Sequence, residues 1–236
     1  MSKHQKSLSS PKTYPIPRKE RPWAIKPSPG PHSQDNCVPL GIIIRDVLNY
    51  AESVSEVKRI LKKGNCEVDG KRVSDHRFPV GIFDSLKFGD EFFRVVPSKR
   101  GFKLVGISEK DSKEKICRLE DKKIIKDGDL QLTFNDGKTF LDREDEFMDV
   151  DTGSSVVISL PDLEIVELIE LDKDQDIMIT EGKNRGEVAQ FKKKKNLKGS
   201  NENRVIVSQE NKELDLPESL VFPIDTDIIK GDPEEE

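Results

Sequence analysis

Lysine and arginine side chains gather at three places in the sequence, and the chemistry that such clusters perform is the binding of phosphate groups. The first group lies on either side of a predicted turn and consists of Lys58, Arg59, Lys62, Lys63, Lys71 and Arg72. The second group is the run Lys192, Lys193, Lys194 and Lys195. The third lies near the N-terminus and consists of Lys12, Arg18, Lys19, Arg21 and Lys26. Cations that neutralise phosphates release counterions, so the groups suit a nucleic-acid partner, although a run of lysines taken alone is more often a solvated surface.

The charge is divided unevenly along the 236 residues. The net charge is −5, yet residues 1–103 carry 20 Lys and Arg against 11 Asp and Glu. The bias is steepest in residues 1–37, which have a net charge of +5 and few apolar side chains. An acidic chain with a basic first part predicts a polyanionic partner for that part, although a chance fluctuation of surface charge is the simpler alternative.

Signals for catalysis, metals and cofactors are weak. The three histidines His4, His32 and His76 have no partner at a ligand spacing, and no Cys-x-x-Cys pair occurs. The sequence contains no Gly-x-x-x-x-Gly-Lys-Ser/Thr loop of the kind that binds nucleoside triphosphates, and no recognisable acid/base motif. We therefore expect a protein that is not an enzyme, with no metal, no cofactor and no small-molecule substrate.

The cysteines and the distribution of apolar residues indicate in which cellular compartment the protein is located. Three widely separated cysteines do not form a disulfide framework, which favours a reducing environment. No stretch approaches the roughly 18 apolar residues that a membrane span needs, and no apolar run follows the N-terminus. The sequence therefore predicts a cytoplasmic protein without a membrane partner.

The elements that position the first basic group are predicted from periodicity. Apolar residues recur at helical spacing from Leu40 to Leu48, which predicts a first helix with Arg45 off its apolar stripe. Ser53 and Glu56 have the spacing of a capping box and predict the start of a second helix, which Gly64 would end. Asp69-Gly70 then predicts a tight hairpin.

The remainder of the chain predicts strands and small cores, since only 33% of the residues are hydrophobic. Alternating apolar residues on either side of Asn135-Asp136-Gly137 predict one hairpin, and the glycine loop Gly182 to Gly186 predicts another. The predicted fold class is α+β with several domains. The predicted parts are a basic Pro-rich extended tail (1–37), a helix-helix-hairpin module (38–96), a central β-rich domain (97–171), a small β-domain (172–221) and an acidic tail (222–236).

The proline-rich N-terminal segment lacks the apolar residues to fold alone, and prolines exclude a long helix from it. It is expected to order on RNA, with Trp23 and Tyr14 stacking on bases. A flexible linker is an equally good interpretation of this segment taken alone.

Two parts of the chain resemble known modules. The order helix, capped helix, Gly64, strand, Val68-Asp69-Gly70-Lys71, strand resembles the alpha-L RNA-binding module of ribosomal proteins, pseudouridine synthases and tyrosyl-tRNA synthetases. The loop around Gly182, Lys183, Asn184 and Arg185 resembles a KOW motif, whose fold is a small SH3-like barrel. Glycines there would let backbone amides approach RNA closely, whereas an ordinary hairpin turn is the alternative.

The order of these parts resembles the small-subunit ribosomal protein four family of the eukaryotic and archaeal type. Local likenesses are Pro29-Gly30-Pro31-His32, Pro39-Leu40, Pro79-Val80-Gly81-Ile82-Phe83-Asp84 and the glycine loop. The resemblance implies a structural, non-catalytic protein of the small ribosomal subunit that supports translation, with ribosomal RNA and neighbouring ribosomal proteins as partners. It places Arg45 and the first basic group on the RNA face of the alpha-L module, with Gly182, Lys183, Asn184 and Arg185 at the KOW loop. Glu181 departs from the small residue that the family tends to carry there.

Two other functions remain open on the sequence alone. A transcription or translation factor that carries a KOW motif would associate with its target only transiently. An RNA-modifying enzyme with an alpha-L anchor would need a catalytic domain in residues 97–171, which lack the Gly-Arg-Leu-Asp stretch of the pseudouridine synthases.

Overall fold

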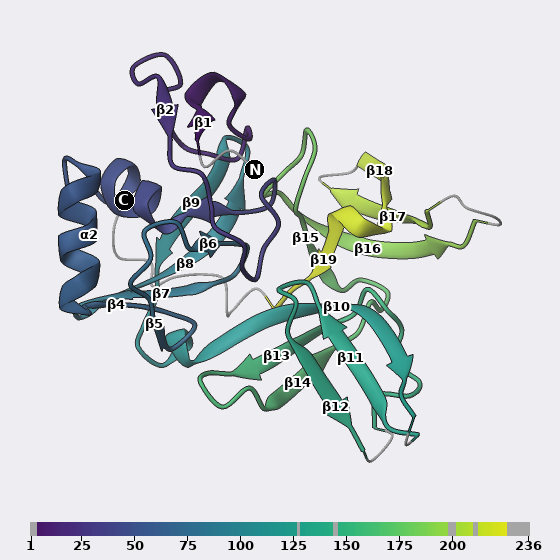
Figure 1. Ribbon diagram of the computed structural model, residues 1–236. Helices are drawn as coiled ribbons and strands as arrows, with labels where there is room; N and C mark the ends of the chain where they lie inside the picture. The colour runs from purple at the N-terminus through teal and green to yellow at the C-terminus, as the bar shows by residue number, and fades with distance from the viewer. Residues whose placement is uncertain (1–3, 127, 144–145, 198–201, 210–211, 226–236) are drawn as a thin grey trace. The chain divides into compact units, whose positions relative to one another are not determined.

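Short strands make up most of the regular secondary structure in a computed structural model of the chain (Figure 1). The structure describes residues 4–126, 128–143, 146–197, 202–209 and 212–225. Contacts divide these residues into an N-terminal unit that ends at Lys115 and a C-terminal unit that begins at Ile116. The described part of the chain is therefore mostly β with few helices. The predicted α+β class is confirmed in part, since strands dominate it.

A five-stranded antiparallel sheet forms the centre of the N-terminal unit. Its strands, in spatial order, are β5 (Lys71–Arg72), β4 (Cys66–Val68), β7 (Ser85–Phe88), β8 (Glu91–Ser98) and β9 (Gly101–Gly106). The hairpin between β4 and β5 pairs Val68 with Lys71 across Asp69-Gly70, as the sequence predicts. The domain boundary expected after residue 96 falls inside β8, because β8 and β9 continue the sheet that β4 begins.

Two helical segments pack against this sheet. The first is a short α-turn, α1 (Leu40–Ile42), that continues as a π-helix, η2 (Ile43–Val47); the second is α2 (Val54–Lys63). The single regular helix expected from residue 40 to residue 48 does not form. Leu40 to Ile44 are all buried, so the segment is enclosed on every side and lacks a solvent face. It enters from β3 (Val38–Pro39), which pairs with β6 (Pro79–Val80).

The sequence left open whether the N-terminal segment orders on RNA or is a flexible linker, and the segment packs onto the same unit. It contains β1 (Gln5–Lys6), the 3-10 turn η1 (Ser7–Ser9) and β2 (Trp23–Ala24), and β1 pairs with β2. Tyr14 is only 3% exposed and belongs to the hydrophobic core, against which Ile16 and Ile25 also pack. These three apolar anchors among the prolines explain this packing, and they remove Tyr14 from the residues that can stack on a base.

The C-terminal unit contains two further five-stranded sheets. The first has the order β12 (Thr139–Asp142), β11 (Leu130–Phe134), β10 (Glu114–Ile124), β13 (Ser155–Ser159) and β14 (Ile165–Ile169), and the 3-10 turn η3 (Asp111–Lys113) precedes it. Leu130, Leu132 and Phe134 alternate into its core as the sequence predicts. The β11–β12 hairpin confirms the turn expected at Asn135-Asp136-Gly137.

The second sheet contains the predicted glycine loop. Its order is β18 (Lys212–Pro217), β17 (Arg204–Gln209), β16 (Val188–Lys195), β15 (Asp176–Ile179) and β19 (Val221–Pro223), with the 3-10 turn η4 (Glu218–Leu220) before β19. Because β19 pairs with β15, the boundary expected after residue 221 falls inside a strand. The acidic tail expected at 222–236 lies outside the described residues from residue 226 onward.

Candidate nucleic-acid interface

The helix α2 holds the first basic group and is capped at both ends. The hydroxyl of Ser53 accepts a hydrogen bond from the backbone N–H of Glu56 (3.3 Å), and the carboxylate of Glu56 accepts one from the N–H of Glu52 (2.9 Å). Gly64 ends the helix in the left-handed conformation, with φ of +80°. Val57 and Leu61 face the core. These contacts fix which side of α2 faces solvent.

That solvent side is basic. Its exposed cations, together with those of β5, are Lys58, Arg59, Lys62, Lys63, Lys71 and Arg72. We call these six side chains the α2–β5 face. Within the described residues, none of them has a carboxylate oxygen within 4.0 Å. Lys62 and Lys63 also lie in the last turn, where the partial negative charge of the helix terminus favours cations. The face therefore offers positive charge that the protein itself does not neutralise.

Arg72 joins the helix to the hairpin. Its guanidinium donates a hydrogen bond to the carbonyl oxygen of Lys63 (3.0 Å), which is one of the carbonyls that the end of α2 leaves without an intrahelical partner. The guanidinium also lies over Gly64, in the space that a Cβ atom at that position would occupy. Arg72 thus fixes β5 against the end of α2, so the two elements that carry the six cations are held together.

We expect Gly64→Ala to lower the free energy of unfolding by about 2 kcal/mol, because alanine is strained in the left-handed region by roughly 1–2 kcal/mol and would also displace Arg72. Gly89→Ala is the matched control, since Gly89 has φ of +61° and no atom lies within 4 Å of the position that a Cβ there would take. Urea unfolding of both variants gives the comparison. Equal losses would show that Arg72 does not contribute to the end of the helix.

Arg45 does not reach this face. Its side chain is 8% exposed and forms two hydrogen bonds with the carboxylate of Asp46, from Nε (2.9 Å) and from Nη2 (2.7 Å). Because the π-helix is buried, the position that looked solvent-facing on a helical stripe is enclosed. We therefore remove Arg45 from the candidate RNA-binding residues.

Some of the candidate RNA-binding side chains of the N-terminal segment are exposed, and others are half-buried. Lys12, Lys19, Arg21 and Trp23 are exposed. Arg21 lies 3.7 Å from a carboxylate oxygen of Asp46. Arg18 is half-buried and donates to the carbonyl oxygen of Pro11 (2.8 Å), and Lys26 is also half-buried. The exposed members remain available to a partner, whereas Arg18 serves the local fold.

The glycine loop lies in residues 180–187, which join β15 to β16. Gly182 and Gly186 have φ of +84° and +78°, and the N–H of Gly186 donates to the carbonyl oxygen of Ile179 (2.7 Å). Lys183 is exposed, whereas Asn184 and Arg185 are half-buried. Burial lowers the pKa of Arg185, and the charge of Glu181 opposes that shift. No atom lies within 4 Å of the position that a Cβ at Gly182 would take, so the backbone there is open to a close approach.

The run of lysines on β16 is largely neutralised by the protein itself. Lys192 contacts Asp174 (2.6 Å), Lys194 contacts Glu218 (2.6 Å) and Lys195 contacts Asp215 (3.1 Å). Lys193 is exposed. Three of the four predicted phosphate ligands therefore already have carboxylate partners from strands or turns that the linear sequence places far away.

A buried charged network was not visible in the sequence. The carboxylate of Asp84 contacts Nε2 of His32 (2.9 Å) and Nζ of Lys115 (2.6 Å), and it accepts a hydrogen bond from the N–H of Gly81 (2.8 Å). Lys115 also contacts Asp69 (2.6 Å) in the β4–β5 turn. Side chains of His32, Asp84 and Lys115 are 4%, 1% and 1% exposed. Burial by itself would raise the pKa of Asp84, but the charges of His32 and Lys115 outweigh burial and hold that pKa well below its usual range.

This buried network stabilises the turn of the hairpin that carries Lys71 and Arg72. His32 of the N-terminal segment and Lys115 of β10 both contact the carboxylate of Asp84, and Lys115 also contacts Asp69 in the turn of the β4–β5 hairpin. The family resemblance included the segment Pro79 to Asp84, but nothing in the local sequence identified His32 and Lys115 as the partners of the Asp84 carboxylate.

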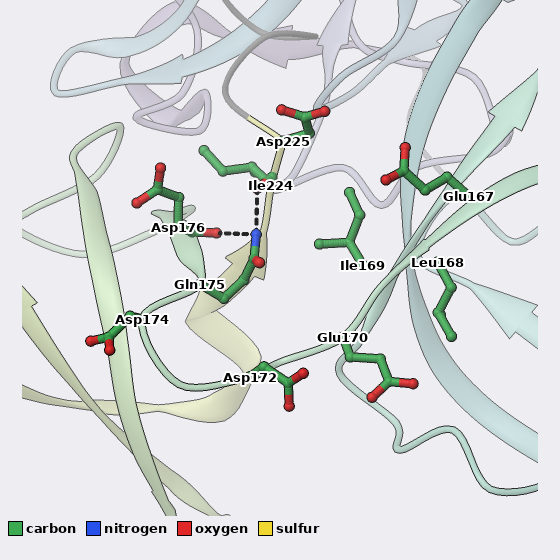
Figure 2. A pocket seen from close by; sticks show the side chains of 10 residues that line it. All are labelled: Glu167, Leu168, Ile169, Glu170, Asp172, Asp174, Gln175, Asp176, Ile224 and Asp225. Carbon is green, nitrogen blue, oxygen red and sulfur yellow. Dashed lines mark hydrogen bonds between the residues drawn. The ribbon is translucent and has the colours of Figure 1, made fainter.

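An acidic hollow of about 590 Å³ lies in the C-terminal unit (Figure 2). Its carboxylates are Glu167, Glu170, Asp172, Asp174, Asp176 and Asp225. Gln175 closes one side by donating to the carbonyl oxygen of Ile224 (2.9 Å). Such a surface repels phosphate, so it does not extend the candidate interface.

The described residues offer little for other kinds of site. No group of three or more His, Cys, Asp or Glu side chains there is arranged to hold a metal ion. The three cysteines are free and buried, and burial raises the pKa of the Cys37 and Cys66 thiols to about 12. No helix of the described part is long and apolar enough to cross a membrane.

Comparison with known proteins identifies the family. Residues 89–165 match the family model described as ribosomal family S4e, and residues 1–35 match the RS4NT (NUC023) domain. A small ribosomal subunit protein eS4 of Methanothermobacter thermautotrophicus is 39% identical over 194 residues, covering 81% of this chain and 78% of the relative. Its counterpart in Staphylothermus marinus is 36% identical over 233 residues, covering 94% of this chain and 92% of the relative.

The fold agrees with these matches. The crystal structure of the 30S ribosomal protein S4e from Thermoplasma acidophilum superposes with a TM-score of 0.70 at 28% identity, covering 80% of this chain and 95% of that chain. Sequence relatives and the solved structure therefore point to the same group of proteins over most of the length of the chain. This chain belongs to the ribosomal S4e family.

Proposed function

We propose that this chain is a structural constituent of the small ribosomal subunit and that it binds ribosomal RNA through the α2–β5 face. The observation that carries the RNA contact is the set of exposed cations on α2 and β5 that no described carboxylate neutralises. Phosphates supply the missing negative charge, and neutralising several of them together releases counterions. The subunit assignment follows from membership in the family.

The α2–β5 face acts in this proposal as an alpha-L module, which docks a helix and a hairpin on folded RNA. The buried network around Asp84 supports that role because it fixes the hairpin turn through Asp69. A preorganised face loses less side-chain and loop freedom when it binds than a flexible one. The exposed residues Lys12, Lys19, Arg21 and Trp23 extend the contact along the N-terminal segment.

The sheet from β15 to β19 acts as a KOW-type barrel with a smaller contact. Its open glycine at residue 182 and the exposed Lys183 support an approach of the RNA backbone at the loop. The lysine run beside the loop contributes little, because most of its charge is already paired. Neighbouring ribosomal proteins are the partners that best suit the acidic surface of this unit.

Family membership also decides between the functions that the sequence left open. Members of the family are structural proteins, so the chain is not an enzyme, and the matches give no support to a transient factor or a modifying enzyme. The protein is ribosome-associated in this proposal, and its place is the cytoplasm. Free protein is expected to be a minor fraction.

Fractionation of a native lysate on a sucrose gradient tests the assignment. We expect one copy of the chain per small subunit, retained after a wash at moderate salt, because several phosphate contacts and a folded docking face act together. Substoichiometric amounts that wash off would identify a transient factor. Migration in the free fractions alone would contradict the proposal.

A further inference from the structure

The β1–β2 ribbon has one buried face and one exposed face. Gln5 pairs with Ala24, and Lys6 pairs with Trp23. Residues directly opposite each other in an antiparallel pair have their side chains on the same face. Gln5 is 7% exposed, whereas Lys6 is exposed and Trp23 is 54% exposed. The pairing therefore places an indole and a lysine together on the face that looks toward solvent.

His4 completes this face. It lies two residues before Lys6, and side chains two apart on a strand point to the same side. Its ring centroid is 5.7 Å from that of Trp23, and the two planes are tilted by 56°. The imidazole therefore lies beside the indole but is not stacked on it. We call the exposed side chains of His4, Lys6 and Trp23 the ribbon platform.

The surroundings of the platform are basic. Residues 4–26 contain six lysines and arginines and one carboxylate, that of Glu20. Arg21 lies two residues before Trp23 and is exposed. A protein partner that buried the indole in an apolar pocket would have to desolvate Lys6 as well, which is costly unless the partner supplies a carboxylate. A nucleotide offers both a π-face for the indole and a phosphate for the lysine.

We infer that the ribbon platform binds one unpaired nucleotide of the ribosomal RNA, with the base stacked on Trp23 and the phosphate beside Lys6; this inference rests on the proposed function. A base inside a duplex is stacked on both sides and cannot stack on a side chain, so the nucleotide belongs to a loop, a bulge or a single strand. The platform adds a contact different in kind from the α2–β5 face, which meets backbone phosphates alone.

Tryptophan fluorescence gives a direct test, because Trp23 is the only tryptophan in the chain. The full-length protein is titrated with a single-stranded oligoadenylate and with a blunt RNA duplex of equal phosphate number. We expect the single strand to quench the emission of Trp23 and the duplex to bind without quenching. Equal emission with both RNAs would overturn the inference while leaving RNA binding itself intact.

Variants separate stacking from charge. Trp23→Ala is expected to weaken single-strand binding on the order of 10-fold to 100-fold, Trp23→Phe to retain most of the affinity, and neither to alter duplex binding. Leu8→Ala removes a side chain of the same segment that is 72% exposed but has no aromatic face, and it is expected to leave both affinities unchanged. Thermal unfolding of each variant checks that the fold is intact.

Two further outcomes would contradict the inference. Emission of Trp23 that shifts to shorter wavelength only in assembled subunits, with no quenching by RNA alone, would assign the platform to an apolar pocket of a neighbouring protein. Failure of the unmodified chain to bind either RNA would contradict the proposed function as well, and this result is distinguished from the first by direct measurement of binding with labelled RNA.

Discussion

Asp84→Asn is expected to lower the free energy of unfolding of the N-terminal unit by about 3–5 kcal/mol at neutral pH. The carboxylate accepts from His32, Lys115 and the N–H of Gly81 in a site where its own side chain is 1% exposed. An amide of the same shape removes the negative charge and takes one carboxylate contact from the buried ammonium of Lys115. Urea unfolding followed by circular dichroism measures the loss.

The control for this variant is Asp90→Asn, which removes the same charge from an exposed turn between β7 and β8. A surface carboxylate contributes little, so the stability of the control should stay within about 0.5 kcal/mol of the unmodified protein. Similar losses for the two variants would show that the buried network does not stabilise the unit.

The pH dependence of the Asp84→Asn effect has a defined sign. The folded-state pKa of Asp84 is depressed below the unfolded value of about 3.9, because the charges of His32 and Lys115 outweigh the opposing effect of burial. The carboxylate therefore stabilises the fold above about pH 4, and this stabilisation is lost as the pH falls toward the folded pKa. The stability difference between the unmodified protein and Asp84→Asn should accordingly shrink in acid.

Replacement of Lys58, Arg59, Lys62 and Lys63 by glutamine is expected to weaken binding to small-subunit ribosomal RNA on the order of 10-fold to 100-fold at low salt. The slope of log affinity against log salt should fall by about 3, since each lost phosphate contact removes nearly one released counterion. Glutamine retains the length and helix propensity of the replaced residues, so α2 should stay folded. Filter binding over a salt series measures both quantities.

A matched set of four charges serves as the control. Lys192, Lys194, Lys195 and Arg204 all have carboxylate partners within the C-terminal unit. Their replacement by glutamine changes the net charge by the same amount but removes cations that already share three carboxylates, those of Asp174, Glu218 and Asp215. We expect a much smaller change in slope, and an equal change would mean that RNA binding depends on total charge rather than on the α2–β5 face.

Local signals predicted the elements that carry this face. The cap at Ser53, the end of α2 at Gly64 and the turn at Asp69-Gly70 depend on contacts between residues close in sequence, and each is present. Backbone chemistry of this kind is readable without knowledge of the fold.

Partners distant in sequence were not predictable in the same way. Arg45 occupied an apparently polar position of a helical stripe, yet the π-helix that carries it is enclosed, so its side chain is buried beside Asp46. The lysines of β16 formed an uninterrupted basic run, but β18, η4 and the loop before β15 supplied their carboxylates. A run of lysines can be recognised in the sequence, but whether those lysines can bind RNA depends on which carboxylates the fold places beside them.

The N-terminal segment illustrates the same limit. Its prolines and charges left ordering on RNA and a flexible linker as equal alternatives, but Tyr14, Ile16 and Ile25 anchor the segment to the core of the N-terminal unit. Few apolar residues are enough when a neighbouring core already exists, because the segment then completes that core instead of building its own. Composition alone did not identify which residues would serve in this way.

An electron cryomicroscopy structure of the small ribosomal subunit that contains this chain tests the central claim most directly. We predict one copy of the chain per subunit, with the side chains of α2 and β5 against phosphates of ribosomal RNA and those of Lys192, Lys194 and Lys195 still paired with their carboxylates. A chain whose α2–β5 face lies in solvent or against protein, while another surface contacts the RNA, would contradict the account.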